Sequence, residues 1–257
     1  MQLLGVKPLT ANISSRTMVK IPERNGENAL ENQLILVDEH DREVGFCEKL
    51  ETHERGLLHR AFSVFIFRKV LVDNPDGTRT FRNQLLIQKR AAGKYHSAGL
   101  WANSCCSHPR KGEETEAAAV RRLPEETGIE VTALEGFSKS CSGLQEKGAF
   151  IYKAEFDNGL TEHEFDHVFT GRLRADSRPG ICKQDCNTDS LNPAEGELHF
   201  NREEAEEMKF VDVEHVMRDV LLNPDDYAAW FMPALLIATE GTEFGSLNPE
   251  ASGRLAY

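Results

Sequence analysis

The spacing of apolar and polar residues predicts a sheet in the first part of the chain. Residues 33–50, QLILVDEHDREVGFCEKL, indicate two short strands around a polar turn at 38–42. The run HRAFSVFIFRKVLV (59–72) is almost continuously apolar, which favours a central strand buried on both faces. NPDG at 74–77 marks a turn, so we expect 81–90 to form the returning strand.

The second part of the chain alternates between helical and extended patterns. Residues 112–129 combine alanines with Glu and Arg, which predicts a helix, and Gly128 suits its C-terminal end. Asn158-Gly159 is a strong hairpin signal between two further predicted strands. We expect these strands at 148–156 and 165–173, and two closing helices at 211–222 and 226–239.

The order of these elements predicts the fold class and the domain limits. Strands and helices alternate without a regular βαβ repeat, which favours an α+β fold in which helices sandwich a mixed β-sheet. We expect one domain at 33–240, a flexible N-terminal tail at 1–32 and a C-terminal tail at 241–257. The polar, irregular segment 176–200 is expected to be a loop inserted into that domain.

Composition and charge restrict the classes of function. The chain has 257 residues, 40% hydrophobic and 28% charged, and no apolar run is long enough to span a bilayer. Its formal net charge of -12 argues against general nucleic-acid binding, so an anionic ligand would need a local cluster of Lys and Arg. Six cysteines without a visible secretory signal favour a reducing cytoplasm and free thiols.

Three short segments carry residue types that can bind a metal or act in catalysis: KLETHERGLLHRAF (49–62), NSCCSHP (103–109) and TEHEFDH (161–167). NSCCSHP (103–109) places Cys106 and His108 two residues apart, so an extended backbone would turn both toward one face. Taken alone, each segment has an ordinary structural explanation that is at least as good as the chemical one. Together, three imidazoles and two carboxylates would form a divalent metal site, with Cys106 as a neighbour rather than a ligand. These ligands would be His53, His59, His108, Glu162 and Glu164.

The predicted helix carries a separate signal. Nudix hydrolases have a box of the form G-x5-E-x7-R-E-U-x-E-E-x-G-U, with U aliphatic, and the chain keeps this frame when aligned on Gly128. Ser107 replaces the opening Gly and Arg122 replaces the first catalytic Glu, which removes a carboxylate that hydrolysis depends on. Glu126 remains on the same helix face, where it and Arg122 could hold a magnesium ion and a phosphate oxygen. Pro124 is expected to kink the last turn, at a cost of ~3 kcal/mol in an ideal helix.

These features occur in one order along the chain. The degenerate box directly follows NSCCSHP, is preceded by GLLHRAFSVFIF and is followed by EHE (162–164). In this combination the chain, from about residue 34 to 240, resembles the type I isopentenyl-diphosphate isomerase family. The resemblance implies a Nudix-like fold and the interconversion of isopentenyl and dimethylallyl diphosphate in isoprenoid precursor biosynthesis. It also implies Cys106 as the catalytic thiol, and a Mn²⁺, Zn²⁺ or Mg²⁺ ion at the three-histidine, two-glutamate site.

The same resemblance implies roles for further residues. Tyr152 and Trp230 match the active-site tyrosine and tryptophan of the family, although Ala229 stands where the usual proline precedes the tryptophan. Glu126 matches the glutamate that holds Mg²⁺ against the diphosphate. The diphosphate-binding cations would be Lys49, Arg90, Lys94 and Arg122.

Moving the double bond requires an acid and a base beside the substrate, in a dry pocket lined by aromatic residues. We expect the Glu164–Tyr152 side to donate a proton and Cys106 to accept one, with the roles exchanged in the reverse direction. The partner would be a small-molecule diphosphate bound by a monomer or homodimer, with no nucleic acid and no membrane. The alternatives are a Nudix hydrolase of nucleoside diphosphates, which Arg122 disfavours, and a zinc-stabilised interaction module, which would not need the four cations.

Overall fold

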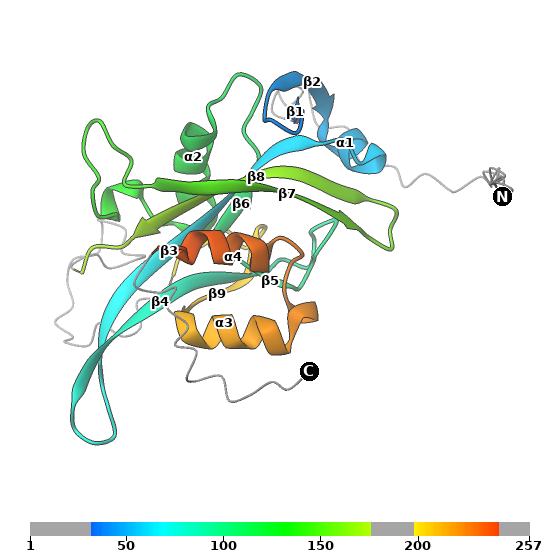
Figure 1. Ribbon diagram of the computed structural model, residues 1–257. Helices are drawn as coiled ribbons and strands as arrows, with labels where there is room; N and C mark the ends of the chain where they lie inside the picture. Colours follow the sequence, from blue (N-terminus) through cyan, green and yellow to red (C-terminus); the bar gives the residue numbers. More distant parts are fainter. Residues whose placement is uncertain (1–31, 176–197, 242–257) are drawn as a thin grey trace, which may run out of the picture.

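The computed structural model describes residues 32–175 and 198–241, which form the coloured ribbon of Figure 1. The expected tails at 1–32 and 241–257 and the expected inserted loop at 176–200 fall almost entirely outside these residues. Within the described ranges, no helix is long and apolar enough to cross a lipid bilayer.

The described residues form strands, four α-helices and two short 3₁₀ turns. The strands are β1 Gln33–Val37, β2 Glu43–Glu48, β3 His59–Asp73, β4 Arg79–Arg90, β5 Trp101–Ala102, β6 Cys105–Ser107, β7 Gln145–Glu155, β8 Thr161–Arg172 and β9 Ala205–Asp212. The helices are α1 Lys49–Arg55, α2 Thr115–Thr127, α3 Val213–Leu222 and α4 Phe231–Thr239, and the 3₁₀ turns are η1 Val131–Ala133 and η2 Pro224–Asp226.

The strands join in one sheet around β3. β3 pairs antiparallel with β1, β4 and β6, and parallel with β8. β7 extends the sheet beyond β8, and β9 pairs with β4. The sheet is therefore mixed, which confirms the expected fold class.

Helices cover both faces of this sheet. Successive side chains of β3 point to opposite sides, so its apolar residues need cover on each face. Phe62, Val64 and Ile66 pack in the core under α2. Phe65 and Phe67 pack in a second core, under α3 and α4. In Figure 1, α2 lies on one side of β3 while α3 and α4 lie on the other. The apolar run thus forms a strand that is buried on both faces as far as Phe67, as its pattern predicted, whereas residues 68–73 are half-buried or exposed.

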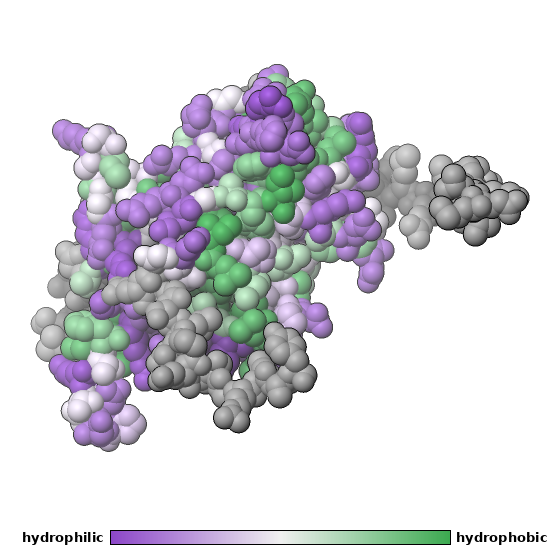
Figure 2. Space-filling view, viewed as in Figure 1, coloured by the Kyte–Doolittle hydropathy of each residue, from purple (hydrophilic) through white to green (hydrophobic). Residues whose placement is uncertain are grey.

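The outer surface is mostly hydrophilic on the face drawn in Figure 2. Hydrophobic residues gather near the middle of that face, over α4, where Leu236 is exposed.

Most of the predicted elements are present, with shifted limits. The hairpin forms at Asn158-Gly159, and Gly128 ends α2 with a left-handed φ of 70°. α2 continues through Pro124, whose carbonyl accepts a hydrogen bond of 3.0 Å from the Gly128 N–H. β8 begins at Thr161 rather than at 165, and α4 begins at Phe231 rather than at 226. The earlier start of β8 brings the EHE segment into the strand.

Several elements were not expected from the sequence, and the longest of them are α1 and β9. α1 is a seven-residue helix with no long apolar stripe, and β9 precedes α3 in a segment rich in Glu. Both occupy sites that only the tertiary structure defines, since β9 pairs with β4 and α1 contacts β8.

Candidate active site

Four side chains from separate elements converge beside β3. His53 lies on α1, His59 opens β3, His108 follows β6 and Glu164 lies on β8. Their potential ligand atoms all lie within 4.8 Å of one another. The parallel pairing of β3 with β8 sets His59 opposite Glu164, so the sheet itself brings these distant residues together. The four side chains could hold a metal ion.

Two histidines of this cluster, His53 and His59, are oriented as metal ligands usually are. Nδ1 of His53 lies 2.6 Å from the carbonyl oxygen of Lys49, and Nδ1 of His59 lies 2.8 Å from that of Leu57. Because a carbonyl only accepts, each Nδ1 donates and each Nε2 keeps a lone pair for a metal. Nε2 of His59 lies 3.4 Å from Oε1 of Glu164 and makes no hydrogen bond to the described residues. Burial lowers the pKa of His53 to about 4 and that of His108 to about 3, which keeps both rings neutral at pH 7.

Glu164 is held on both carboxylate oxygens. Oε1 lies 2.9 Å from Nε2 of His108, and Oε2 accepts a hydrogen bond of 2.6 Å from the Tyr152 hydroxyl. The β7–β8 register sets Tyr152 opposite Glu164. Burial by itself would raise the pKa of Glu164, but His108 and His59 outweigh burial and hold it well below the usual range. The carboxylate is therefore ionised.

Glu162 lies on the same face of β8 but outside the cluster of four. Its Oε1 lies 3.1 Å from Nδ1 of His96, and its buried Oε2 has no hydrogen-bond partner in the described part of the chain. Burial and the nearby Glu164 raise the pKa of Glu162 well above its usual value. Its expected role as a fifth metal ligand stays a prediction. His96 was not anticipated, because a lone histidine in KYHSA offers no spacing signal.

The adjacent cysteines of β6 have different surroundings. Cys105 is fully buried in the core under α2, whereas Cys106 lines a pocket. Nη1 of Arg90 lies 3.4 Å from the sulfur of Cys106. Burial raises the pKa of the Cys106 thiol to about 12, although Arg90 acts in the opposite direction. The thiol is therefore protonated at neutral pH.

Trp230 forms an apolar wall of the same pocket. Its indole Nε1 donates a hydrogen bond of 2.9 Å to Oδ1 of Asn103. Its ring centroid lies 6.2 Å from that of Tyr152, and the guanidinium carbon of Arg90 lies 5.1 Å from the ring centroid of Trp230. The indole is thus fixed by Asn103 at one edge and faces both polar and aromatic neighbours.

The pocket collects side chains from most of these segments. Its cavity volume is about 80 Å³, and it is partly open to solvent. The expected catalytic residues and cations all line it: Cys106, Glu164, Tyr152, Trp230, Lys49, Arg90, Lys94 and Arg122. An acidic chain thus has a local concentration of positive charge, as an anionic ligand would require.

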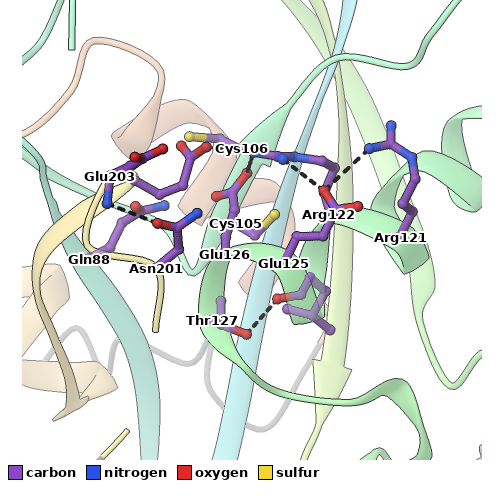
Figure 3. A network of polar contacts seen from close by, with 12 residues as sticks. Gln88, Cys105, Cys106, Arg121, Arg122, Glu125, Glu126, Thr127, Asn201 and Glu203 are labelled. Atoms are coloured by element: carbon purple, nitrogen blue, oxygen red, sulfur yellow. Dashed lines mark hydrogen bonds and ion pairs between the residues drawn. The ribbon is translucent and has the colours of Figure 1, made fainter. Parts of the chain in front are cut away.

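Arg122 extends from α2 into a group of carboxylates (Figure 3). Its Nη1 donates to Glu125 at 2.8 Å. Its Nη2 donates to Glu126 at 2.8 Å and to Glu204 at 2.9 Å. Glu204 also forms an ion pair with Lys94. Burial opposes the charge on Arg122, but its neighbours, Glu126 and Glu204 among them, outweigh burial and raise the pKa of the guanidinium.

Glu204 lines the pocket but was not anticipated from the sequence. It lies in the acidic run REEAEE, where nothing distinguishes one carboxylate from its neighbours.

Comparison with known proteins first gives the class of protein. Residues 58–231 match the NUDIX domain family. The solved structure of DR0079 from Deinococcus radiodurans has a TM-score of 0.52 at 18% identity, over 80% of this chain and 98% of that chain. At this identity the likeness shows a shared fold alone. The protein therefore contains a Nudix domain.

Curated relatives then give the family within that class. Isopentenyl-diphosphate Delta-isomerase 2 of Aromatoleum aromaticum is 42% identical over 206 residues, which cover 80% of this chain and 86% of the relative. The isopentenyl-diphosphate Delta-isomerase of Serratia proteamaculans is 36% identical over 227 residues, which cover 88% of this chain and 99% of the relative. The chain belongs to the isopentenyl-diphosphate Delta-isomerase family, which confirms the resemblance inferred from its motifs.

Proposed function

We propose that this protein interconverts isopentenyl diphosphate and dimethylallyl diphosphate in isoprenoid precursor biosynthesis. The observation that carries the proposal is one pocket that combines Cys106, the Glu164–Tyr152 pair and four cationic side chains. The names of the related proteins from Aromatoleum aromaticum and Serratia proteamaculans support it.

The reaction moves a double bond by adding a proton to one alkene carbon and removing a proton from a carbon two positions away. The energetic cost lies in a tertiary, carbocation-like state that water would quench. A pocket with aromatic walls excludes water. The face of Trp230 can stabilise the positive charge by roughly 2 kcal/mol when desolvated.

Cys106 and Glu164 would act as the acid and the base on either side of the substrate. Burial raises the pKa of Cys106 to about 12, and the pKa of Glu164 lies well below its usual range. In this state the thiol carries a proton and the carboxylate can accept one. The expected assignment, with the Glu164–Tyr152 side as donor, needs the opposite protonation state and stays a prediction. Because the reaction is reversible, each group serves in both roles.

The histidine–glutamate cluster would hold a divalent metal ion, since imidazole and carboxylate donors suit Mn²⁺, Zn²⁺ or Mg²⁺. When bound, the ion would supply positive charge that increases the acidity of neighbouring groups. The protein's own part is to keep Glu164 between His108 and the Tyr152 hydroxyl. The proposed ligands are His53, His59, His108 and Glu164, with Glu162 as the predicted fifth.

The diphosphate would bind among the cationic side chains that line the pocket. Glu126 is almost fully buried at 1% exposure and would hold Mg²⁺ against the phosphate oxygens. Lys49, Arg90, Lys94 and Arg122 would neutralise the remaining negative charge. Binding energy from this remote group can then be used to orient the reacting carbons.

A Nudix hydrolase function is disfavoured by the box itself. Arg122 stands where the box has its first catalytic carboxylate, and its guanidinium lies 2.8 Å from Glu126. A cation in that place can bind a phosphate oxygen but cannot bind a metal ion. We further expect the protein to act in the cytoplasm as a monomer or homodimer.

Replacing the proposed thiol tests the function. In the presence of Mg²⁺, the purified protein should interconvert the two C5 diphosphates, and Cys106→Ala should lower kcat by about 10³-fold. Cys141→Ala is the matched control, because Cys141 is an exposed free cysteine. An active Cys106→Ala variant would refute the role of the thiol. Phosphate release from nucleotides without alkene isomerisation would refute the proposed reaction.

A further inference from the structure

Glu204 lies between two of the proposed diphosphate-binding cations. Its Oε1 accepts a hydrogen bond of 2.9 Å from Nη2 of Arg122, and its Oε2 contacts Nζ of Lys94. The carboxylate is 19% exposed. Burial would raise the pKa of Glu204, but Lys94 and Arg122 together outweigh it and lower the pKa, so the group is ionised. One carboxylate thus bridges two cations that come from different segments.

The main chain around Glu204 is attached to both of those segments. The Asn201 N–H donates a hydrogen bond of 2.9 Å to the carbonyl of Glu126, near the end of α2. The Ala91 N–H donates a hydrogen bond of 3.1 Å to the carbonyl of Glu204. The Lys94 N–H donates a hydrogen bond of 3.1 Å to the carbonyl of Ala91. The loop that leads into β9 is therefore fixed to α2 on one side and to the loop after β4 on the other.

We propose that Glu204 is a positioning residue of the diphosphate site, which orders Lys94 and Arg122 before the substrate binds. The inference rests on the proposed function, because it assumes that these two cations bind the diphosphate. Long cationic side chains lose rotamer freedom when they bind a ligand, and a carboxylate that already holds both reduces that loss. It also offsets part of the positive charge that four cations and a magnesium ion would concentrate in one pocket.

Glu204 is itself an anion near an anionic ligand, and this repulsion opposes the ordering effect. Both cations nevertheless keep donors for the substrate while Glu204 holds them. An ammonium group has three N–H donors, of which Lys94 uses one for Glu204. The Arg122 guanidinium has five, and its bonds to Glu125, Glu126 and Glu204 use one N–H of Nη1 and both of Nη2, which leaves the second N–H of Nη1 for a ligand. We therefore expect ordering to dominate, so that loss of the carboxylate weakens diphosphate binding rather than strengthening it.

Glu204→Gln tests the inference, because it keeps the shape of the side chain and removes its charge. KM for isopentenyl diphosphate should rise about tenfold while kcat changes less than about threefold. The dissociation constant for inorganic diphosphate with Mg²⁺, measured by calorimetry, should rise by a similar factor. Glu203→Gln is the matched control, since Glu203 is adjacent in sequence, carries the same charge and is exposed. The control should leave KM and the dissociation constant unchanged.

The outcomes separate this inference from the proposed function. An active Glu204→Gln enzyme with unchanged or tighter diphosphate binding would overturn the positioning role and leave the function intact. A fall in kcat alone, with KM unchanged, would also overturn it. A wild-type protein that binds no diphosphate would overturn both. Thermal unfolding of each variant shows whether the fold is retained, and the binding difference between Glu204→Gln and Glu203→Gln decides the inference.

Discussion

Residues of one type behave differently in this site because their neighbours differ. Glu162 and Glu164 lie two positions apart on one face of β8, and both are buried. The pKa of Glu164 is held low by His108 and His59, whereas burial and the charge of Glu164 raise that of Glu162. Pairs of carboxyls whose pKa values are driven apart in this way are typical of acid–base sites. The protonation state of each carboxyl group therefore depends on its neighbours as much as on the residue type.

Tyr152 is the residue through which the proton path can be tested. Its hydroxyl donates to Oε2 of Glu164 at 2.6 Å, and burial raises its pKa well above the usual value. Tyr152→Phe keeps the aromatic wall and removes only this hydroxyl. We expect kcat to fall about 10²-fold with KM changed less than about threefold, because the cations that would bind the diphosphate are untouched. Steady-state kinetics with isopentenyl diphosphate gives both values.

Tyr227→Phe is the matched control for this change. Its hydroxyl also donates to a carboxylate, Oδ2 of Asp219, at 2.7 Å, but neither residue lines the pocket. The Tyr227→Phe variant should retain the wild-type kcat. Full activity in Tyr152→Phe would exclude its hydroxyl from the proton transfer.

At the level of the element, the end of α2 fixes the position of Arg122 and Glu126. Gly128 adopts a left-handed φ of 70°, and its N–H closes the last turn by donating to the Pro124 carbonyl. The carbonyl oxygen of His199 lies so close to Gly128 that a Cβ atom would overlap it. A glycine is required here both for its backbone angle and for the space beside it.

Gly128→Ala should therefore destabilise the fold more than an ordinary left-handed glycine would. We expect the free energy of unfolding to fall by roughly 3 kcal/mol, since strain and overlap add. Gly77→Ala is the comparison, because Gly77 has a φ of 81° but no atom within 4 Å of the added Cβ. That variant should lose only about 1 kcal/mol. Urea unfolding of both proteins measures the difference, and equal losses would show that the contact with His199 is unimportant.

For the whole molecule, local patterns in the sequence predicted the main strands of the sheet. They did not predict the elements that form only through contacts between distant segments. The apolar run of β3 and the Asn158-Gly159 turn carry their signal within a few residues, and both are present. α1 and β9 have no such signal, because α1 depends on contacts with β8 and β9 on pairing with β4.

The same distinction applies to the site. Cys106 and Glu164 were anticipated because they lie in recognisable motifs, and they line one pocket. His96 and Glu204 also line it, but each stands in a segment without a motif and reaches the pocket only through tertiary contacts. Residues of this second kind are found from coordinates rather than from spacing.

The metal cluster links the site to the stability of the whole fold. Its four side chains come from α1, β3, β8 and the segment after β6, so a bound ion would connect elements that lie far apart in the sequence. An ion at a hundred times its dissociation constant stabilises the folded state by about 2.7 kcal/mol. For a protein of this size we therefore expect Tm to rise by roughly 5–10 °C when Mn²⁺ or Zn²⁺ is added to chelator-treated protein.

His108→Ala should abolish most of this shift in Tm, because it removes one of the four proposed ligands. His40→Ala, which alters an exposed histidine, should retain the shift. A Tm that does not respond to metal, or a shift that persists in His108→Ala, would show that these side chains do not form the metal site.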